Sequence, residues 1–189
     1  QIDGAVRIGA MTRQADAEHD ATVAAGAPLL AKALPNVGHF QIRNRGTVGG
    51  SIVHADPSAE LPTATLALDA TIEIAGAEGV RRVPASEFFL GAMETAVGEY
   101  EIVTAIEFPT WGPGSGFAVE ELARRHGDFA LVGAMCGVRL ASGSVAQSTV
   151  AMFGVGSTPV RCHAAEAALA GAAADDIDPV AIAKTAVAD

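Results

Sequence analysis

The run Gly46-Thr47-Val48-Gly49-Gly50-Ser51 constrains what this chain can fold into and bind more than any other stretch. Glycine lets the backbone turn tightly and approach a ligand without a Cβ in the way. Successive backbone N–H groups in such a turn form a concavity that holds an anion without a lysine. Thr47 and Ser51 add hydroxyl donors to the same concavity. The run therefore predicts a turn that binds a diphosphate.

Local chemistry leaves a second interpretation open, because glycine-rich turns also join secondary-structure elements without binding anything. The run is not the G-x-G-x-x-G fingerprint, and it is not a Walker loop, since no Gly-Lys-Ser/Thr follows it. Two acidic residues come shortly afterwards in the chain. Asp56 and Glu60 are therefore candidates to accept hydrogen bonds from ribose or ribityl hydroxyls.

The charge of the chain restricts its partners. With 22 acidic and 12 basic residues the formal net charge is -10, so the electrostatic term opposes binding to a nucleic-acid backbone. No apolar run reaches the length of a membrane span, and no basic-then-apolar signal segment opens the chain. We therefore expect a cytoplasmic protein with no nucleic-acid partner and no membrane span.

The sequence contains no spacing typical of a catalytic or metal-binding motif. The five histidines do not form H-E-x-x-H, and Ser51 lacks the G-x-S-x-G setting of a nucleophile. Cys136 lies in an apolar run and is expected to be a buried strand thiol; Cys162 is the other cysteine. Two cysteines cannot supply the four thiolates of an iron–sulfur cluster. We predict no catalytic side chain and no metal ligand, which fits chemistry that belongs to a cofactor.

The pattern of apolar and turn-forming residues predicts an α+β fold. Residues 38–50 are expected to form a glycine loop, with a short strand or turn at 52–53 beneath it, and residues 111–116 a domain linker. Helices are expected at residues 23–34, 58–68, 164–170 and 179–188. Strands are expected at residues 5–10, 70–75, 80–83, 101–108, 117–122, 129–140 and 145–155.

Three segments together resemble a known family. They are Arg-Asn-Arg-Gly-Thr-Val-Gly-Gly-Ser at residues 43–51, His-Ala-Asp-Pro-Ser-Ala-Glu-Leu-Pro at 54–62, and Arg-Arg-His-Gly-Asp-Phe-Ala at 124–130. In residue identity and in their order along the chain, they resemble the FAD-binding medium subunits of molybdenum hydroxylases, such as carbon monoxide dehydrogenase and the xanthine dehydrogenases. The resemblance runs from Gly4 to about Gly171, and its motifs are specific in combination.

The resemblance implies two domains. Residues 1–110 look like the second lobe of a PCMH-type FAD-binding domain. Residues 114–189 look like the C-terminal domain of the carbon monoxide dehydrogenase flavoprotein, with a three-stranded antiparallel sheet and helices. Members of the family carry an earlier glycine loop on the other side of the FAD diphosphate, and this chain starts after it. We therefore expect the chain as given to bind FAD poorly.

The resemblance also implies a function. It points to the flavin electron-transfer subunit of a heterotrimeric molybdenum hydroxylase, usually a dimer of trimers (a heterohexamer). Electrons would come from an iron–sulfur small subunit, after oxidation of substrate in a molybdenum-binding large subunit. FAD would pass them to an acceptor such as NAD or a quinone. Molybdopterin and [2Fe-2S] clusters are expected only in those partner subunits.

By the same resemblance, FAD contacts fall on a defined set of residues. Val103 matches the family position where an aliphatic residue packs on the isoalloxazine ring, and Arg124 would place positive charge near the flavin or its phosphates. In relatives of the xanthine dehydrogenase type a lysine reaches the flavin from the strand that here carries Glu120 and Glu121, so that contact is absent or replaced. The full predicted set is Gly46, Thr47, Val48, Gly49, Gly50, Ser51, Asp56, Glu60, Val103 and Arg124.

Two other functions stay open on the sequence. One is a stand-alone FAD-dependent oxidase or reductase, which would need its own substrate pocket and a catalytic base. The other is a non-catalytic nucleotide-binding or assembly module. Flavin absorbance in the purified protein separates the module from both enzymes. Co-purification with molybdenum-binding and cysteine-rich chains separates the electron-transfer subunit from the stand-alone enzyme.

Overall fold

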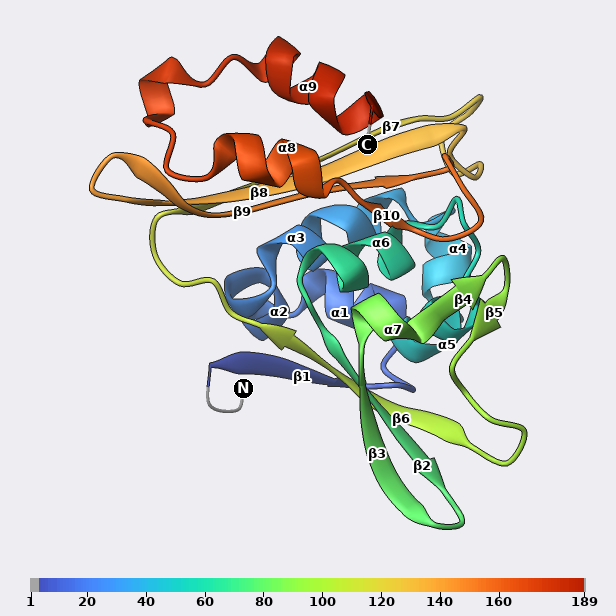
Figure 1. Cartoon of the computed structure of the whole chain (residues 1–189). Helices are drawn as coiled ribbons and strands as arrows, with labels where there is room; N and C mark the ends of the chain where they lie inside the picture. Colours follow the sequence, from blue (N-terminus) through green and yellow to red (C-terminus); the bar gives the residue numbers. More distant parts are fainter. Residues whose placement is uncertain (1–3, 189) are drawn as a thin grey trace.

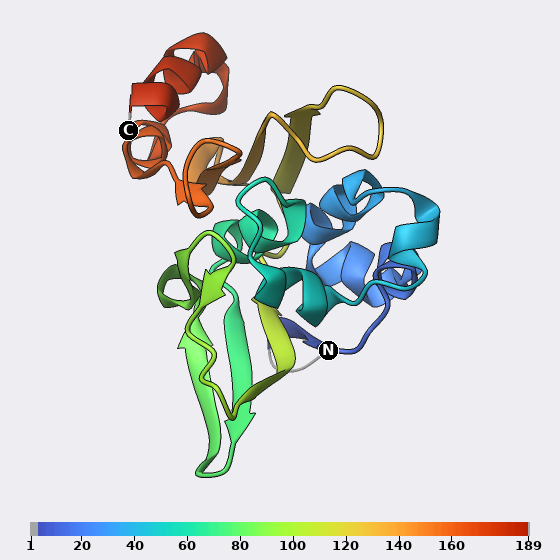
Figure 2. The same cartoon turned by 90° about the vertical axis from the view of Figure 1, so that its right-hand side faces the viewer.

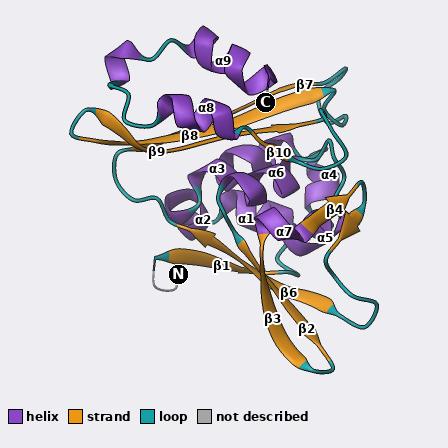
Figure 3. Ribbon diagram, in the orientation of Figure 1, coloured by secondary structure: helices purple, strands orange, loops and turns teal. Residues whose placement is uncertain are grey.

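The computed structural model describes residues 4–188, which stack in four alternating layers of sheet, helices, sheet and helices (Figures 1 and 3). The helices are α1 (Gln14–His19), α2 (Ala21–Gly26), α3 (Pro28–Ala33), α4 (Phe40–Arg43), α5 (Val48–His54), α6 (Glu60–Ala67), α7 (Ala85–Phe88), α8 (His163–Leu169) and α9 (Pro179–Ala188). The strands are β1 (Ala5–Gly9), β2 (Thr71–Gly76), β3 (Gly79–Pro84), β4 (Phe89–Gly91), β5 (Glu94–Thr95), β6 (Ile102–Pro109), β7 (Ser115–Leu122), β8 (Val132–Ala141), β9 (Ser144–Phe153) and β10 (Val160–Arg161).

The first sheet has the order β1-β6-β2-β3 and is antiparallel throughout. Its inner face is built by alternation, because Ile72 and Ile74 of β2 are fully buried while their neighbours are half-buried. The pairing of β2 with β6 shifts by one residue between Glu73 and Ile74. This irregularity explains why the adjacent Ala105 and Ile106 of β6 are both fully buried.

Helix α6 lies between the two large sheets and is the central element of the core. All eight of its residues are buried, and the helix packs against α3, β8 and β9. Its buried hydroxyls are satisfied within the helix, since Thr65 Oγ1 donates to the carbonyl of Leu61 at 2.7 Å. Pro62 falls in the first turn, where a missing N–H costs little. The predicted helix at residues 58–68 is therefore confirmed as α6, which begins at the buried Glu60.

The second sheet has four strands in the order β10-β9-β8-β7, where the sequence predicted three. The additional strand is short: Val160 and Arg161 pair with Met152 and Ala151 of β9. A two-residue strand is too short to produce a periodic pattern, so it could not be predicted from the sequence. The predicted α+β class is confirmed, with helices and antiparallel sheets in separate layers.

Helices α8 and α9 cover the outer face of the second sheet, and the β2–β3 hairpin projects at the opposite end of the molecule (Figures 1 and 2). A small second core lies beneath α8, where Cys162, Ala165 and Leu169 contact Val145 and Val150. The main core is continuous from the first sheet through the helical layer to the second sheet. It includes Ile72, Phe108, Leu30, Leu61, Met135 and Phe153.

Three local predictions are wrong. The helix expected at 23–34 is two helices, because Pro28 has no N–H to continue α2 and instead begins α3. The segment expected to be a loop with a strand at 52–53 contains helix α5. Cys136 is exposed rather than buried, since strand alternation turns Met135 inward in its place.

Candidate functional site

The glycine run folds as the start of α5, and Thr47 is its N-cap. The Thr47 side chain accepts a hydrogen bond from the Gly50 N–H at 3.0 Å. An isolated β-bridge between Arg13 and Thr47 fixes this segment beside the loop after β1. Glycine is a poor helix former, so a helix here depends on tertiary contacts rather than on propensity.

The predicted concavity of free N–H groups is wrong for residues 48–51, because these amides already have acceptors within the protein. The Val48 and Gly49 N–H groups donate to the carbonyls of Thr12 and Ala10, both at 2.9 Å. Gly50 donates to Thr47 Oγ1, and the Ser51 N–H donates to the Thr47 carbonyl at 3.1 Å. The N–H groups of residues 48–51 are therefore not free to bind a phosphate.

Gly49 is required for packing. A Cβ at this buried position would lie 2.5 Å from the Ala10 Cβ and 2.8 Å from the Ala10 carbonyl oxygen. Real Cβ atoms do not approach backbone so closely, so only glycine lets α5 approach the end of β1. The glycines of one motif therefore have different roles.

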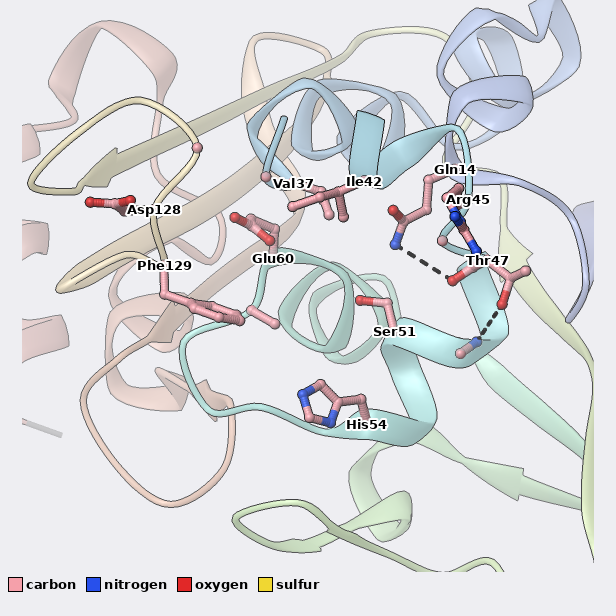
Figure 4. Close-up of a pocket in the computed structure, with 15 residues that line it drawn as sticks. Gln14, Val37, Ile42, Arg45, Thr47, Ser51, His54, Glu60, Asp128 and Phe129 are labelled. Carbon is pink, nitrogen blue, oxygen red and sulfur yellow. Dashed lines mark hydrogen bonds between the residues drawn. The ribbon is translucent and has the colours of Figure 1, made fainter. Parts of the chain in front are cut away.

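A pocket of about 480 Å³ opens beside α5, a size typical of ligand sites (Figure 4). Gln14, Arg45 and Thr47 lie at one end of the pocket, and Glu60 and Phe129 lie at the other (Figure 4). The pocket thus lies where the helical layer meets the loop between β7 and β8. Its remaining lining residues are Val37, Gly38, Ile42, Gly46, Gly50, Ser51, His54, Ala59, Gly127 and Asp128.

Gln14 is the most unusual residue of the wall. Its side chain is only 4% exposed, and its Nε2 lies 3.5 Å from the Thr47 carbonyl. Its Oε1 is buried and has no hydrogen-bond partner among the described residues. Buried polar atoms are almost always paired, so an orphaned amide oxygen lining a pocket indicates a place for a ligand donor. The exposed Arg45 lies close by and adds a positive charge to this end.

Glu60 gives the other end an acidic wall. The residue is 4% exposed, and burial, followed by the charges of Glu121 and Asp56, raises its pKa from 4.5 to about 7. Asp56 does not line the pocket, and its carboxylate accepts a hydrogen bond from the Ser58 N–H at 2.8 Å. Glu60 is therefore the acceptor that the geometry places in the site, and Asp56 belongs to the turn before α6.

The structure brings half of the predicted residues into the pocket and leaves the others outside it. Gly46, Thr47, Gly50, Ser51 and Glu60 line the pocket. The predicted residues that do not line it are the buried Val48 and Gly49, the half-buried Asp56, the core residue Val103 and the exposed Arg124. Contact of these residues with a flavin stays a prediction.

Several lining residues carry no recognisable signal in the sequence. Gln14 is 33 positions from Thr47 and reaches it only through the bridge at Arg13. Val37 and Ile42 read as ordinary apolar residues before the glycine run. Phe129 did have a signal, because it lies in the Arg-Arg-His-Gly-Asp-Phe-Ala segment that carries the resemblance. Within residues 4–188, no helix combines the length and apolarity needed to cross a membrane, and no cluster of three or more metal-ligating side chains occurs.

Fold and pocket together define an α+β segment with a ligand-sized cavity, and family models identify its class. Residues 1–111 match the model described as the FAD binding domain in molybdopterin dehydrogenase, and residues 117–189 match the CO dehydrogenase flavoprotein C-terminal domain. The chain therefore belongs to the family of FAD-binding medium subunits of molybdenum hydroxylases, and the resemblance found in its motifs is confirmed.

Individual relatives agree with this assignment. The chain is 38% identical to the 6-hydroxypseudooxynicotine dehydrogenase complex subunit alpha of Paenarthrobacter nicotinovorans, over 94% of this chain and 65% of the relative. It is 37% identical to the carbon monoxide dehydrogenase medium chain of Hydrogenophaga pseudoflava, over 89% and 58%. A solved structure of that carbon monoxide dehydrogenase, lacking the Mo-pyranopterin moiety, superposes with a TM-score of 0.94 at 38% identity, over 100% of this chain and 66% of the other. The chain thus spans less than two thirds of the length of these relatives.

Proposed function

We propose that this chain holds FAD in the pocket between α5, α6 and the β7–β8 loop, as part of the medium subunit of a molybdenum hydroxylase. The observation that carries the proposal is the buried, orphaned Oε1 of Gln14, a residue of the pocket wall beside Thr47, Ser51 and Arg45. This donor set suits a ligand with phosphate oxygens and sugar hydroxyls. The residues present therefore fit the cofactor of the family.

The roles of the residues follow from their chemistry. Arg45 and the Ser51 hydroxyl are suited to anionic oxygens, because hydrogen bonds from charged donors are short and strong. Gln14 accepts from a hydroxyl or amine, and Glu60 does so from the opposite wall. Val37, Ile42 and Phe129 exclude water from an apolar ring. When bound, FAD supplies the redox chemistry, and the chain positions it.

We extend the proposal to the complete enzyme. The chain would accept electrons from an iron–sulfur small subunit, served by a molybdenum-binding large subunit, and would pass them to NAD or a quinone. Residues 1–110 would form the second lobe of the FAD-binding domain and residues 114–189 the C-terminal domain; residues 1–3 and 189 of these ranges lie outside the described residues. A cytoplasmic heterohexamer is the assembly that we propose.

The binding proposal can be tested with a substitution that fills the pocket. Ser51→Trp places an indole in the cavity, whereas Ser86→Trp places one on the exposed surface of α7. Ligand-observed NMR with millimolar FAD should show binding to the parent chain and to Ser86→Trp, and at least about tenfold weaker binding to Ser51→Trp. Equal FAD binding by both variants would show that FAD does not bind in this pocket.

The electron-transfer part needs the native assembly. A tagged chain recovered from its source cells should bring with it a large chain that contains molybdopterin and a smaller, cysteine-rich chain. Recovery of a flavin-loaded chain alone, active on a small substrate, would instead favour the stand-alone enzyme. Recovery of a chain without flavin or partners would favour the nucleotide-binding module.

A further inference from the structure

Helix α4, which carries part of the pocket wall, has little apolar packing to hold it. It has four residues, none of them buried, and a helix of that length is not stable by itself in water. Val37 and Gly38 lie just before α4, Ile42 lies within it and Arg45 lies shortly after it, and all four line the pocket. The position of this stretch therefore depends strongly on contacts made by polar groups.

The Arg43 side chain makes such contacts. Its Nε and Nη2 donate to the two carboxylate oxygens of Glu18 at 2.7 and 3.3 Å. Its Nη1 donates to the carbonyls of Val37 and Gly38 at 3.1 and 3.0 Å. The ion pair is largely buried, since the Arg43 side chain is 12% exposed and that of Glu18 is 16% exposed. A bidentate pair of this kind fixes orientation as well as distance. One guanidinium therefore connects α1, which carries Glu18, to the turn before α4.

The ion pair also determines where Gln14 lies. Glu18 comes four residues after Gln14 on α1, so both side chains are on the same side of that helix. The Gln14 N–H donates to the Gly46 carbonyl at 3.0 Å, and a Cβ at Gly46 would lie 2.6 Å from the Gln14 Oε1. The bridge between Arg13 and Thr47 holds the start of α1, and Glu18 holds its end. A movement of α1 would therefore shift the orphaned oxygen relative to the rest of the wall.

We propose that Arg43 is a positioning residue: through Glu18 and the turn at 37–38 it holds two walls of the pocket at the separation that a ligand requires. Arg43 does not line the pocket, so it acts on a ligand only through Gln14 and the residues of the turn. Glu18 neutralises its charge, whereas Arg45, two positions on, is exposed and lines the pocket. The two arginines of one motif thus have different roles. The part of the proposal that concerns FAD rests on the proposed function.

Substitutions at Arg43 separate its charge from its geometry. Arg43→Met removes both. Arg43→Lys keeps the charge, but an ammonium cannot present the planar fork that reaches Glu18 and both carbonyls together. The matched control is Arg161→Met. The Arg161 side chain is also 12% exposed and also donates to a carboxylate and to a backbone carbonyl, that of Leu66, yet it lies outside the pocket wall.

Amide hydrogen exchange tests the positioning role without a ligand. The most protected amides of β6, the strand between β1 and β2, exchange through global unfolding and report overall stability. The Gln14 amide, bonded to the Gly46 carbonyl, reports the wall. Relative to the β6 amides, exchange at Gln14 should be about tenfold faster in Arg43→Met than in the parent, and unchanged in Arg161→Met. Arg43→Lys should fall between them, and it supplies the result if Arg43→Met does not fold.

The ion pair can also be tested from its acidic side. Glu18→Gln keeps the length of the side chain and removes its charge, so it should also accelerate exchange at Gln14. In the double variant Glu18→Gln/Arg43→Met the two effects should not add, because both substitutions remove one interaction. Effects that add fully, or exchange at Gln14 that stays in proportion to that of the β6 amides in every variant, would overturn the positioning role.

FAD affinity gives the readout on the ligand side. At a temperature where all variants are folded, FAD should bind Arg43→Met roughly tenfold more weakly than the parent, and Arg161→Met as strongly as the parent. Equal affinities of Arg43→Met and Arg161→Met would contradict the part of the proposal that concerns the ligand. Faster exchange at Gln14 in Arg43→Met, with a parent that binds no FAD, would support the positioning role and would remove FAD as the ligand, which is a failure of the proposed function alone.

Discussion

At the scale of single residues, the glycine motif serves structure and binding at different positions. Gly49 allows α5 to approach Ala10, whereas Gly46 and Gly50 line the pocket. The Gly50 N–H donates to the Thr47 side chain, and contact of Gly50 with a phosphate stays a prediction. The motif sequence alone cannot distinguish these roles, because they depend on which atoms surround each glycine in the folded structure.

Gly49→Ala should therefore destabilise the chain even without a ligand. The new Cβ would clash with the backbone of Ala10, and overpacking of this kind costs about 1–3 kcal/mol of unfolding free energy. Gly116→Ala is the matched control, since a Cβ at that strand position meets nothing within 4 Å. Urea unfolding measures both variants. Equal stability would show that α5 can move away from β1 at little cost.

Gln14→Met should have opposite effects on stability and on binding. A buried acceptor without a donor costs about 1–3 kcal/mol, so replacing Gln14 by an apolar side chain of similar length should leave stability unchanged or higher. Removal of the acceptor should weaken FAD binding roughly tenfold. Unfolding and FAD titration of the same sample test the pair of effects. A destabilised variant with unchanged affinity would contradict the assignment of Gln14 to the ligand.

At the scale of elements, Thr47 decides whether the glycine run is a helix. Thr47→Ala removes the side-chain acceptor of the Gly50 N–H, which should cost about 1 kcal/mol. Thr47→Ser keeps that oxygen and should retain most of the stability. Urea unfolding and hydrogen exchange at Gly50 report the cap. Similar exchange rates in the two variants would mean that the bridge to Arg13 holds the segment without the cap.

The sequence predicted those elements whose pattern is local. The β2–β3 hairpin, β6, α6, α8 and α9 fall where alternation, turn residues and alanine-rich runs placed them. Helix α5 was missed because its glycines disfavour a helix, and only its packing on Ala10 and Thr12 explains it. Motifs placed Thr47, Ser51 and Glu60 in the site. Gln14 could not be found, because a distant bridge brings it there. Arg45 lies within the motif at residues 43–51, but nothing local to it predicted that it lines the pocket.

At the scale of the whole molecule, one side chain connects the second sheet to the helical layer. Arg161 of β10 donates to the carbonyl of Leu66, in the last turn of α6, at 3.1 Å. It also donates to Asp69 Oδ1, just beyond that helix, at 2.7 Å and forms an ion pair with Glu166 of α8. The continuous core supports the same connection, because Met135 and Phe153 pack with residues of the first sheet's cluster. We therefore expect one cooperative unit rather than two independent domains.

Arg161→Met should weaken this connection. The substitution leaves Glu166, which is 14% exposed, without its guanidinium partner, and lost hydrogen bonds to charged groups cost about 1.5–3 kcal/mol each. Arg125→Met, on the exposed β7–β8 loop, is the control. Unfolding followed by tryptophan fluorescence and by circular dichroism should give coincident curves in the parent and earlier transitions in Arg161→Met. A variant as stable as the control would show that the apolar core alone joins the layers.

The central claim is that the pocket at Gln14, Thr47 and Glu60 receives FAD, and amide NMR of the ¹⁵N-labelled chain tests it most directly. Addition of FAD to millimolar concentration should shift the signals of Gly46, Thr47, Ser51 and Phe129, which line the pocket from separate elements. Signals of the β2–β3 hairpin, at the opposite end of the molecule from α8 and α9, should stay in place (Figure 2). Shifts centred outside the pocket, or none at all, would contradict the account.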